Sequence, residues 1–424
     1  MRITHDFARR PATWLPPLLL LLVLAAALPA VYLGGTIDPS GNLRDLPIGI
    51  VVEPQTSTAT NAADQIRDAI SSAVNHDAID LIPMTAQDEQ QRIGAGKIFG
   101  AVRIPADFNA GIARLTTVAA GPPARAVVHL DTAPATGAMS TGLFTGQVAP
   151  AVSAVDTGFG KTLALDPPTV SAATALATPF TVLTAPLDPL PAHTGSGTSI
   201  FYYAMVLVLL GFVGASVIHP TVDSASGFTP SELGPKVQRR RYTHLPRLHI
   251  LLVKWSVMIA AAPLGAGIIQ LVAGKGLDMP IPAPTQLFLF SASAIAAIGI
   301  GALTVFAIFG AFAPLVNMFF FVALAMTSSA GTIPLQAIPQ FFRVIATFEP
   351  MRPIITGLRS ILYYNSSPLS GLRTAWIHVA LVGGIGATTG LVATHLFDRV
   401  PSFTRHPGLA KSAPIPSETI DSVR

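Results

Sequence analysis

The chain has 424 residues, of which 50% are hydrophobic and only 11% are charged. Soluble domains carry about 25% charged residues, so this composition excludes a purely soluble protein and predicts an integral membrane protein. The net charge of +4 reflects basic residues scattered over many segments, which is common in membrane proteins and does not indicate nucleic-acid binding. The lack of cysteine in the sequence excludes disulfides, a thiolate zinc site and a thiol nucleophile.

Residues 1–35 predict a short basic N-terminus followed by a first membrane-spanning helix. The apolar run covers residues 14–33. A span needs about 20 apolar residues, whereas the core of a signal peptide has about 7–15. We therefore expect the helix to stay as an anchor, with cleavage near residues 25–30 as the alternative.

Residues 36–199 have the character of a folded domain outside the membrane, because polar residues, glycine and proline return. Asn61 is the expected N-cap of a helix that faces inward with Ile66, Ala69, Ile70 and Ala73. Short apolar runs predict strands at 46–52, 79–82, 98–104, 126–130 and 178–183, and helical patterns occur at 61–74, 87–93, from 105, and at 135–163. The alternation predicts a small extracytoplasmic α/β domain inserted between the first and second spans.

Five further apolar runs predict a transmembrane bundle over residues 200–396. They cover 200–218, 250–272, 287–309, 312–326 and 375–396. The runs on either side of Gly310 fit a tight hairpin or one broken element, and we predict the hairpin, which gives a mainly α protein with a six-helix bundle. Small residues such as Ser291, Ser293, Gly299 and Gly301 allow close helix packing.

The loop 219–249 joins the second and third spans. Residues 228–232 can start a helix, and three consecutive arginines follow at 239–241. The plain interpretation is that these arginines set the topology and touch anionic lipid head groups. Lys254 lies at the edge of the third span and is expected to snorkel to the surface.

The segment 331–364 precedes the last span and is divided by four prolines. Two amphipathic helices fit between them, with Ile338, Phe341, Phe342 and Ile345 on the face of the first, and Ile354, Ile355, Leu358, Ile361 and Leu362 on the face of the second. Such a pair, joined at a proline corner, suits a re-entrant hairpin lining a cavity or gate. An ordinary interfacial connector fits the pattern equally well. The candidate hairpin residues are Pro334, Pro339, Phe341, Phe342, Pro350, Arg352 and Arg359.

Lysine and arginine are concentrated in segments assigned to the cytoplasm, which predicts a multi-pass protein of the plasma membrane with both termini on the cytoplasmic side. These residues are Arg2, Arg9, Arg10, Lys236, Arg239, Arg240, Arg241, Arg247, Arg399, Arg405, Lys411 and Arg424. Four arginines of the outer side, Arg343, Arg352, Arg359 and Arg373, weaken this bias. The Pro/Ser-rich tail 397–424 is expected to be a disordered cytoplasmic segment.

No catalytic, cofactor-binding or metal-binding residues are predicted. A P-loop needs the pattern G-x-x-x-x-G-K-[ST], and residues 160–162 have only its end, because Val155 stands where the first glycine belongs. His219, His244 and His249 share one loop without the spacing of a metal site. His378 lies near the outer end of the last span, where a role in proton relay is the minority interpretation.

Two groups of short motifs resemble type-2 ABC exporter permeases, closest to the YhgE/Pip branch, which is named for phage infection protein. The runs GTIP at 331–334, IPQFF at 338–342 and FEP at 348–350 are similar to the segment before the last helix of these permeases. DLPIGIVVE at 45–53, GAGK at 94–97 and GAVRIPADF at 100–108 resemble the domain after their first helix. The long coiled insertion of some relatives is missing, so functions tied to it, such as phage reception, are not implied.

The resemblance implies the permease subunit of an exporter that works as a homodimer or paired permease with a separate cytoplasmic ATP-binding subunit. In such exporters the loop after the second span carries a coupling helix, which would place the ATPase contact at Glu232, Arg239, Arg240 and Arg241. An apolar, phenylalanine-lined bundle in contact with membrane lipids fits a hydrophobic or lipidic substrate or a drug. The alternative is a non-transporting cell-envelope scaffold or secretion accessory protein whose outer domain binds a partner. No enzymatic activity and no nucleic-acid partner are expected.

Overall fold

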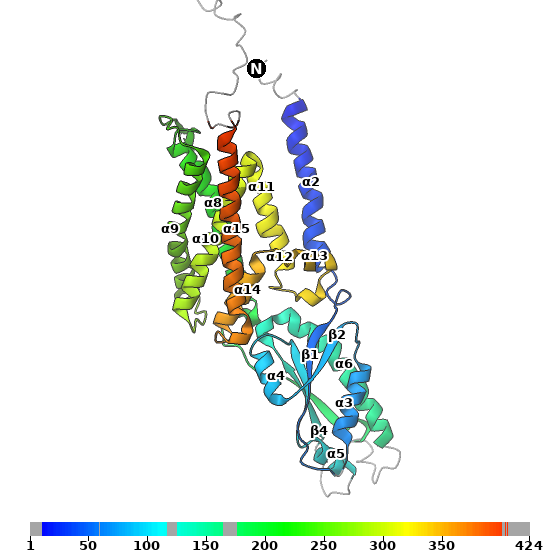
Figure 1. Cartoon of the computed structure of the whole chain (residues 1–424). Coiled ribbons are helices and arrows are strands. Elements are labelled where there is room, and N and C mark those ends of the chain that lie inside the picture. Colours follow the sequence, from blue (N-terminus) through cyan, green and yellow to red (C-terminus); the bar gives the residue numbers. More distant parts are fainter. Residues whose placement is uncertain are drawn as a thin grey trace, which may run out of the picture. The chain divides into compact units, whose positions relative to one another are not determined.

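The computed structural model describes residues 11–58, 60–116, 125–163, 176–400, 403 and 405 (Figure 1). The chain divides into two compact units. The first, which we call the domain unit, comprises Met1–Met205, Gln270–Leu287 and Phe320–His378. The second, the bundle unit, comprises Val206–Ile269, Phe288–Phe319 and Val379–Arg424. Most of the tail predicted at 397–424 lies outside the described residues.

The α/β domain predicted after the first span is present in the domain unit. In the described part of the chain its sheet has five strands in the order β2-β1-β3-β4-β5. They are β1 (Leu46–Val52), β2 (Ile79–Met84), β3 (Gly100–Ile104), β4 (Ala126–Thr132) and β5 (Phe180–Pro186). Neighbouring strands run parallel except β3 and β4, which are antiparallel. The apolar run of β1 is buried between its two neighbours, as expected for a central strand.

Among the described residues of the domain, four helices accompany the sheet: α3 (Ala62–Ala73), α4 (Ala86–Ile93), α5 (Phe108–Thr116) and α6 (Ala138–Leu163). In Figure 1, α3 and α6 lie on one side of the strands and α4 on the other. Ile66 and Ile70 of α3 are buried as predicted, whereas Ala73 is exposed at its end. Asn61 is the N-cap residue of α3, as predicted, but its side chain makes no capping hydrogen bond and accepts from the side chain of Gln65 instead.

Membrane-length helices account for most of the remaining chain. Within the described residues, five helices are long and apolar enough to cross a membrane: Leu18–Thr36, Ser199–Ala225, Arg247–Gly276, Pro284–Ser328 and Leu372–Arg399. They correspond to α2 (Pro11–Thr36), α8 (Ser199–Ala225), α9 (Arg247–Leu271) with a π turn to Gly276, α10 (Pro284–Phe309) with the pieces that follow it, and α15 (Leu372–Arg399). The structure is thus mainly helical, with the α/β domain between the first span and the later ones.

The fourth of these segments, Pro284–Ser328, is 45 residues long, which would measure about 68 Å as one straight helix. It is interrupted at Gly310–Phe312, where Gly310 has a φ of +55°. Beyond the break, Asn317 of α11 (Ala313–Met318) donates to the carbonyl of Ala302 in α10 over 3.2 Å. Fifteen residues of continuous helix would separate these two residues by about 22 Å, so the chain doubles back at Gly310.

Small residues allow the helices of the bundle unit to approach closely. A Cβ added to Gly386 of α15 would lie 3.0 Å from the Cα of Gly301 in α10. A Cβ on Gly299 would meet the side chain of Met258 in α9 at 2.4 Å. The predicted use of Gly299 and Gly301 in helix packing is therefore confirmed.

Candidate functional sites

The segment 331–364 forms two short helices in the domain unit, α13 (Gln340–Ile345) and α14 (Met351–Leu362). Pro339 and Pro350 are the N-cap residues of these two helices, and Pro334 is buried just before a 3-10 turn. Proline suits these positions because the first N–H groups of a helix have no partner within the helix. The prolines therefore define where each helix starts.

Arginines attach this segment to the α/β domain through backbone carbonyls. Arg343 donates to the carbonyls of Asn42 and Gln336, each at 3.0 Å. Arg359 donates over 3.0 Å to the carbonyls of Thr136 and Gly331. Burial lowers the pKa of the Arg359 guanidinium, but an arginine remains charged in proteins. These two arginines are therefore engaged in holding the segment against the α/β domain.

The start of α14 is capped by a buried carboxyl group. Glu349 is 3% exposed and accepts from the backbone N–H groups of Met351 at 2.5 Å and Arg352 at 2.9 Å. Burial raises the pKa of Glu349 to about 8, although both N–H groups act in the opposite direction. Arg352 itself reaches the carbonyl of Ala346 at 3.4 Å. The acidic residue of the FEP motif thus closes the first turn of α14.

The two helices differ in how well their predicted faces are reproduced. On α14, Ile354, Ile355, Leu358, Ile361 and Leu362 are all buried, as predicted. On α13, Phe342 is buried, but Phe341 is 65% exposed, and the side chains of Val344 on this helix and of Phe348 just beyond it are exposed as well. The predicted common face of Phe341 and Phe342 is therefore wrong, because these adjacent residues point to different sides of a helix of only six residues.

The loop after α8 lies in the bundle unit and is not helical. Ser231–Leu233 and Lys236–Gln238 form an antiparallel β-hairpin, β6 and β7, so the helix expected at Glu232–Arg241 is absent there. Gly234 at the turn has a φ of +57° and Pro235 follows it, which favours a turn over a helix. Glu232 pairs with Val237 in this hairpin. Arg239, Arg240 and Arg241 follow in an irregular segment and are all exposed.

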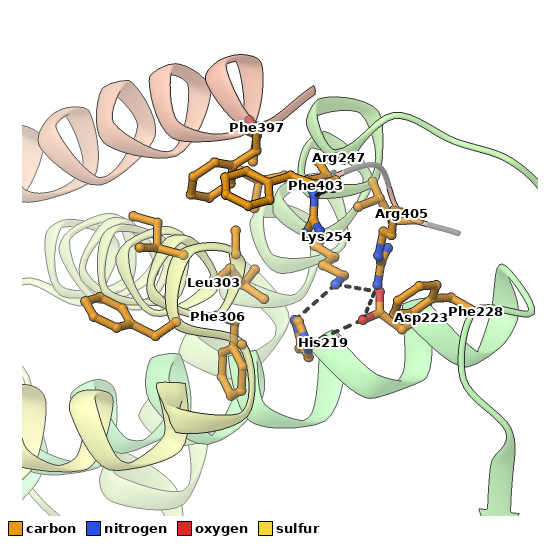
Figure 2. Close-up of a pocket in the computed structure, with 17 residues that line it drawn as sticks. His219, Asp223, Phe228, Arg247, Lys254, Leu303, Phe306, Phe397, Phe403 and Arg405 are labelled. Carbon is orange, nitrogen blue, oxygen red and sulfur yellow. Dashed lines mark hydrogen bonds and ion pairs between the residues drawn. The ribbon is translucent and has the colours of Figure 1, made fainter. Parts of the chain in front are cut away.

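A buried charged cluster in the bundle unit was missed by the sequence analysis. Asp223 of α8 lies 2.6 Å from the Nζ of Lys254 in α9, 2.5 Å from Arg405 and 3.4 Å from the Nε2 of His219 (Figure 2). Lys254 is 3% exposed, so it is paired inside the protein and does not snorkel. One signal of this cluster was present in the sequence, because His219 and Asp223 are four residues apart and so lie on the same face of a helix. Both residues belong to α8, which continues beyond the apolar run to Ala225.

Further contacts join the ends of the helices around this cluster. Asp398 of α15 accepts from the first backbone N–H groups of α9, at Arg247 over 2.9 Å and at Leu248 over 3.1 Å. The side chain of Arg247 donates to the carbonyl of Phe403 over 2.9 Å. Tyr242 of the loop donates to the carbonyl of Arg405. The loop, the start of α9 and the chain after α15 are thus held together in one unit.

A second charged cluster lies in the α/β domain, where three carboxyl groups surround one guanidinium. Arg103 of β3 is 2.7 Å from Asp131, 3.4 Å from Glu53 and 3.8 Å from Glu89. Burial, with the neighbouring Asp131, raises the pKa of Glu89 to about 8. Over the ranges that the structure describes, no group of His, Asp and Glu side chains fits a metal ion. The cluster connects the segment just after β1 with α4, β3 and β4, which is a structural role.

Comparison with family models gives a match to a family described as ABC-2 family transporter protein, over residues 13–394. Comparisons with curated proteins and with solved structures gave no significant match. The matched range contains the first span, the whole α/β domain, the loop after α8 and the segment 331–364. The chain is therefore a multi-pass membrane permease, not itself catalytic, and it belongs to the ABC-2 family of transporter proteins.

Proposed function

We propose that the chain is the membrane subunit of an exporter that moves hydrophobic or lipidic compounds or drugs out of the cell. The observation that carries this proposal is the ABC-2 match over residues 13–394, which takes in the first span, the domain and the bundle in one continuous order. Membership of this permease family implies that the chain works with a partner ATPase. This chain supplies no ATP-binding motif in its sequence, so the ATPase is a separate subunit.

We place six membrane crossings in the chain, with both termini and the loop 226–246 in the cytoplasm. The reversal at Gly310 supports this count, because it divides the 45-residue segment into two arms. An even number of crossings brings both termini to one side. The basic residues of the loop support the cytoplasmic side, and the carbonyl-bound Arg343 and Arg359 no longer argue against it.

The ATPase contact is proposed at the β-hairpin and at Arg239, Arg240 and Arg241. Their exposure supports this assignment. A docking surface needs accessible, complementary charge more than it needs a helix, so an acidic surface on the ATPase fits this loop. The resemblance to type-2 exporter permeases supports the further proposal that the protein works as a homodimer or paired permease.

We assign the protein to the YhgE/Pip branch and the segment 331–364 to a re-entrant hairpin. Its attachment to the α/β domain through Arg343 and Arg359 supports a position on the outer side. The exposed apolar side chains of Phe341, Val344 and Phe348 support contact with lipid. Such a hairpin would cover the outer end of the transport path.

Copurification in a mild detergent tests the proposed function. The tagged protein is expected to recover a stoichiometric ATPase, and changing Arg239, Arg240 and Arg241 together to Ala is expected to remove it. Arg67→Ala, at an exposed arginine of α3 that pairs with Asp64 and Asp68, is the matched control and should keep the ATPase. Recovery of envelope proteins alone, with no ATPase even after crosslinking, would contradict the exporter and favour an envelope scaffold.

A further inference from the structure

A cavity of about 440 Å³ lies in the bundle unit beside the buried charged cluster (Figure 2). This volume is in the usual range for sites that bind small molecules. One part of its lining is apolar, formed by Leu303 and Phe306 of α10, Phe397 of α15 and Phe403. The other part is charged. A cavity with one apolar and one charged wall fits a molecule that has one apolar and one charged part.

The charged wall has more positive than negative groups. Arg247, Lys254 and Arg405 face a single lining carboxylate, Asp223. Asp398 lies just beyond the lining, where both of its oxygens accept from the backbone of α9. Even with Asp398 included, the described residues around the cavity carry one positive charge in excess.

His219 adds no further positive charge to this wall. Lys254 has only N–H donors, so the Nδ1 of His219, 3.0 Å away, must accept from it. The Nε2 then carries the hydrogen and faces Asp223 at 3.4 Å. The ring is therefore a neutral imidazole, which stacks on Phe306 with centroids 4.5 Å apart.

Two cations share one carboxylate in a place with little access to water. Lys254 and Asp223 are each 3% exposed, and Arg405 is 9% exposed and also lies 3.9 Å above the ring of Phe228. A buried charge is costly unless it is paired. A second anion that entered the cavity would give Lys254 and Arg405 one partner each, and Arg247 lies on the same wall.

We propose that this cavity binds the anionic head group of an amphiphile, with its phosphate or carboxylate on Lys254 and Arg405. The apolar chain of the amphiphile then lies on Phe306, Phe397 and Leu303. The inference rests on the proposed function, because it names the substrate class of the exporter. In this arrangement the carboxylate of Asp223 pairs with both Lys254 and Arg405 when no substrate is bound, so it competes with the incoming head group for these two cations.

Binding is measured on the full chain in a neutral detergent by native mass spectrometry and by thermal shift. The probes are lysophosphatidic acid, lysophosphatidylcholine with the same acyl chain, and inorganic phosphate. We expect lysophosphatidic acid to bind at least tenfold more tightly than the other two. Arg405→Gln and Lys254→Met should each reduce this affinity at least tenfold, while Arg373→Gln, at an exposed arginine outside the cavity, should not change it.

Asp223→Asn gives the sharpest test, because it is expected to strengthen the binding of lysophosphatidic acid at least threefold by removing the competing carboxylate. A residue with a purely structural role would not show a gain. Equal binding of the two lysolipids, or weaker binding in the Asp223→Asn protein, would overturn the proposal. Displacement of lysophosphatidic acid by inorganic phosphate at similar concentrations would assign the site to a small anion and also overturn it.

The same preparations are analysed for the copurified ATPase, which separates the two proposals. Loss of the preference for the anionic lysolipid, with the ATPase still bound, would make the inference wrong and leave the exporter intact. Selective binding without any ATPase would support the site and count against the exporter. Gel filtration of each variant identifies any protein that has failed to fold, and the Asp223→Asn and Arg405→Gln results then decide the outcome.

Discussion

Arg103 shows how a single residue organises the α/β domain. It is the basic member of a cluster with Glu53, Glu89 and Asp131, which come from the end of β1 (the residue after it), from α4 and from β4. Glu89 is 1% exposed, and its Oε1 is buried without a hydrogen-bond partner among the described residues. One guanidinium cannot neutralise three carboxylates, so Glu89 is expected to be protonated near neutral pH.

Glu89→Gln is expected to remove a pH dependence of the domain's stability. The pKa of Glu89 is raised from an ordinary value of 4.5 to about 8, so the folded state holds a proton that the unfolded state releases between these values. The stability from this group is complete below pH 4.5 and is lost as the pH rises to 8. Above pH 8 the variant should be more stable than the parent by on the order of 2 kcal/mol.

Pulse proteolysis of the full-length protein in urea, between pH 4.5 and 9, measures this effect. Asp80→Asn, at an exposed carboxylate on the edge strand β2, is the control and should keep the pH dependence of the parent. If the stability of the Glu89→Gln protein and that of the parent changed with pH in parallel, Glu89 would be shown to be already ionised in the folded state.

At the scale of single elements, strands and spans were predictable because their apolar runs are local patterns. The five expected strands of the domain are present, with boundaries shifted by a few residues. The loop after α8 was mispredicted because Gly234-Pro235 favours a turn, while the expectation of a helix came from a possible helix start at residues 228–232 and from the resemblance. The partners of Asp223 could not be predicted from local sequence patterns either, because Lys254 and Arg405 lie 31 and 182 positions away in the chain.

Helix α14 depends on its cap at Glu349, so Glu349→Ala is expected to destabilise its first turn by about 1–2 kcal/mol. Two backbone N–H groups would lose their acceptor in a buried position. Hydrogen exchange of residues 351–362 measures this as faster exchange of the first turn. Thr347→Ala, at an exposed neighbour whose hydroxyl bonds only to its own segment, should leave the exchange of α14 unchanged. Unchanged exchange in the Glu349→Ala protein would mean that packing alone holds the helix.

Contact between α10 and α15 depends on Gly386, so Gly386→Leu is expected to lower stability by about 1–3 kcal/mol. The added side chain would meet the backbone of Gly301, which has no flexible end to move away. Gly384→Leu is the matched control, because a Cβ at Gly384 meets no atom within 4 Å. Thermal unfolding in detergent compares the two proteins. Equal melting temperatures would show that α10 and α15 do not pack at Gly386.

At the scale of the whole molecule, the order of span, domain and bundle could be predicted, since it follows from where apolar and polar stretches alternate. The number of crossings depends on a single glycine. Gly310 with its positive φ separates two runs that are continuous in hydropathy, and the contact of Asn317 with Ala302 shows that they lie side by side. A contact between two apolar helices on either side of a turn could not be predicted from the amino-acid composition of those helices.

Single cysteines in this cysteine-free chain test the topology. With six crossings, Ala311→Cys at the turn and Lys236→Cys in the loop should react with an impermeant maleimide only after the cells are permeabilised, whereas Ser72→Cys in α3 should react in intact cells. All three positions are exposed. A single crossing by the 45-residue segment would instead leave position 311 inside the bilayer, where it reacts from neither side.

Labelling of Ala311→Cys in intact cells would reverse the whole orientation and contradict the cytoplasmic ATPase contact. The expected result has a further consequence for the bundle. Gly310, Arg247 and Arg405 line the same cavity, so the turn, the start of α9 and the chain after α15 must all lie at one end. This condition is met when the turn lies on the side of the loop after α8. In the orientation proposed above, that side is the cytoplasm, so the cation-rich cavity lies at the cytoplasmic end of the bundle unit.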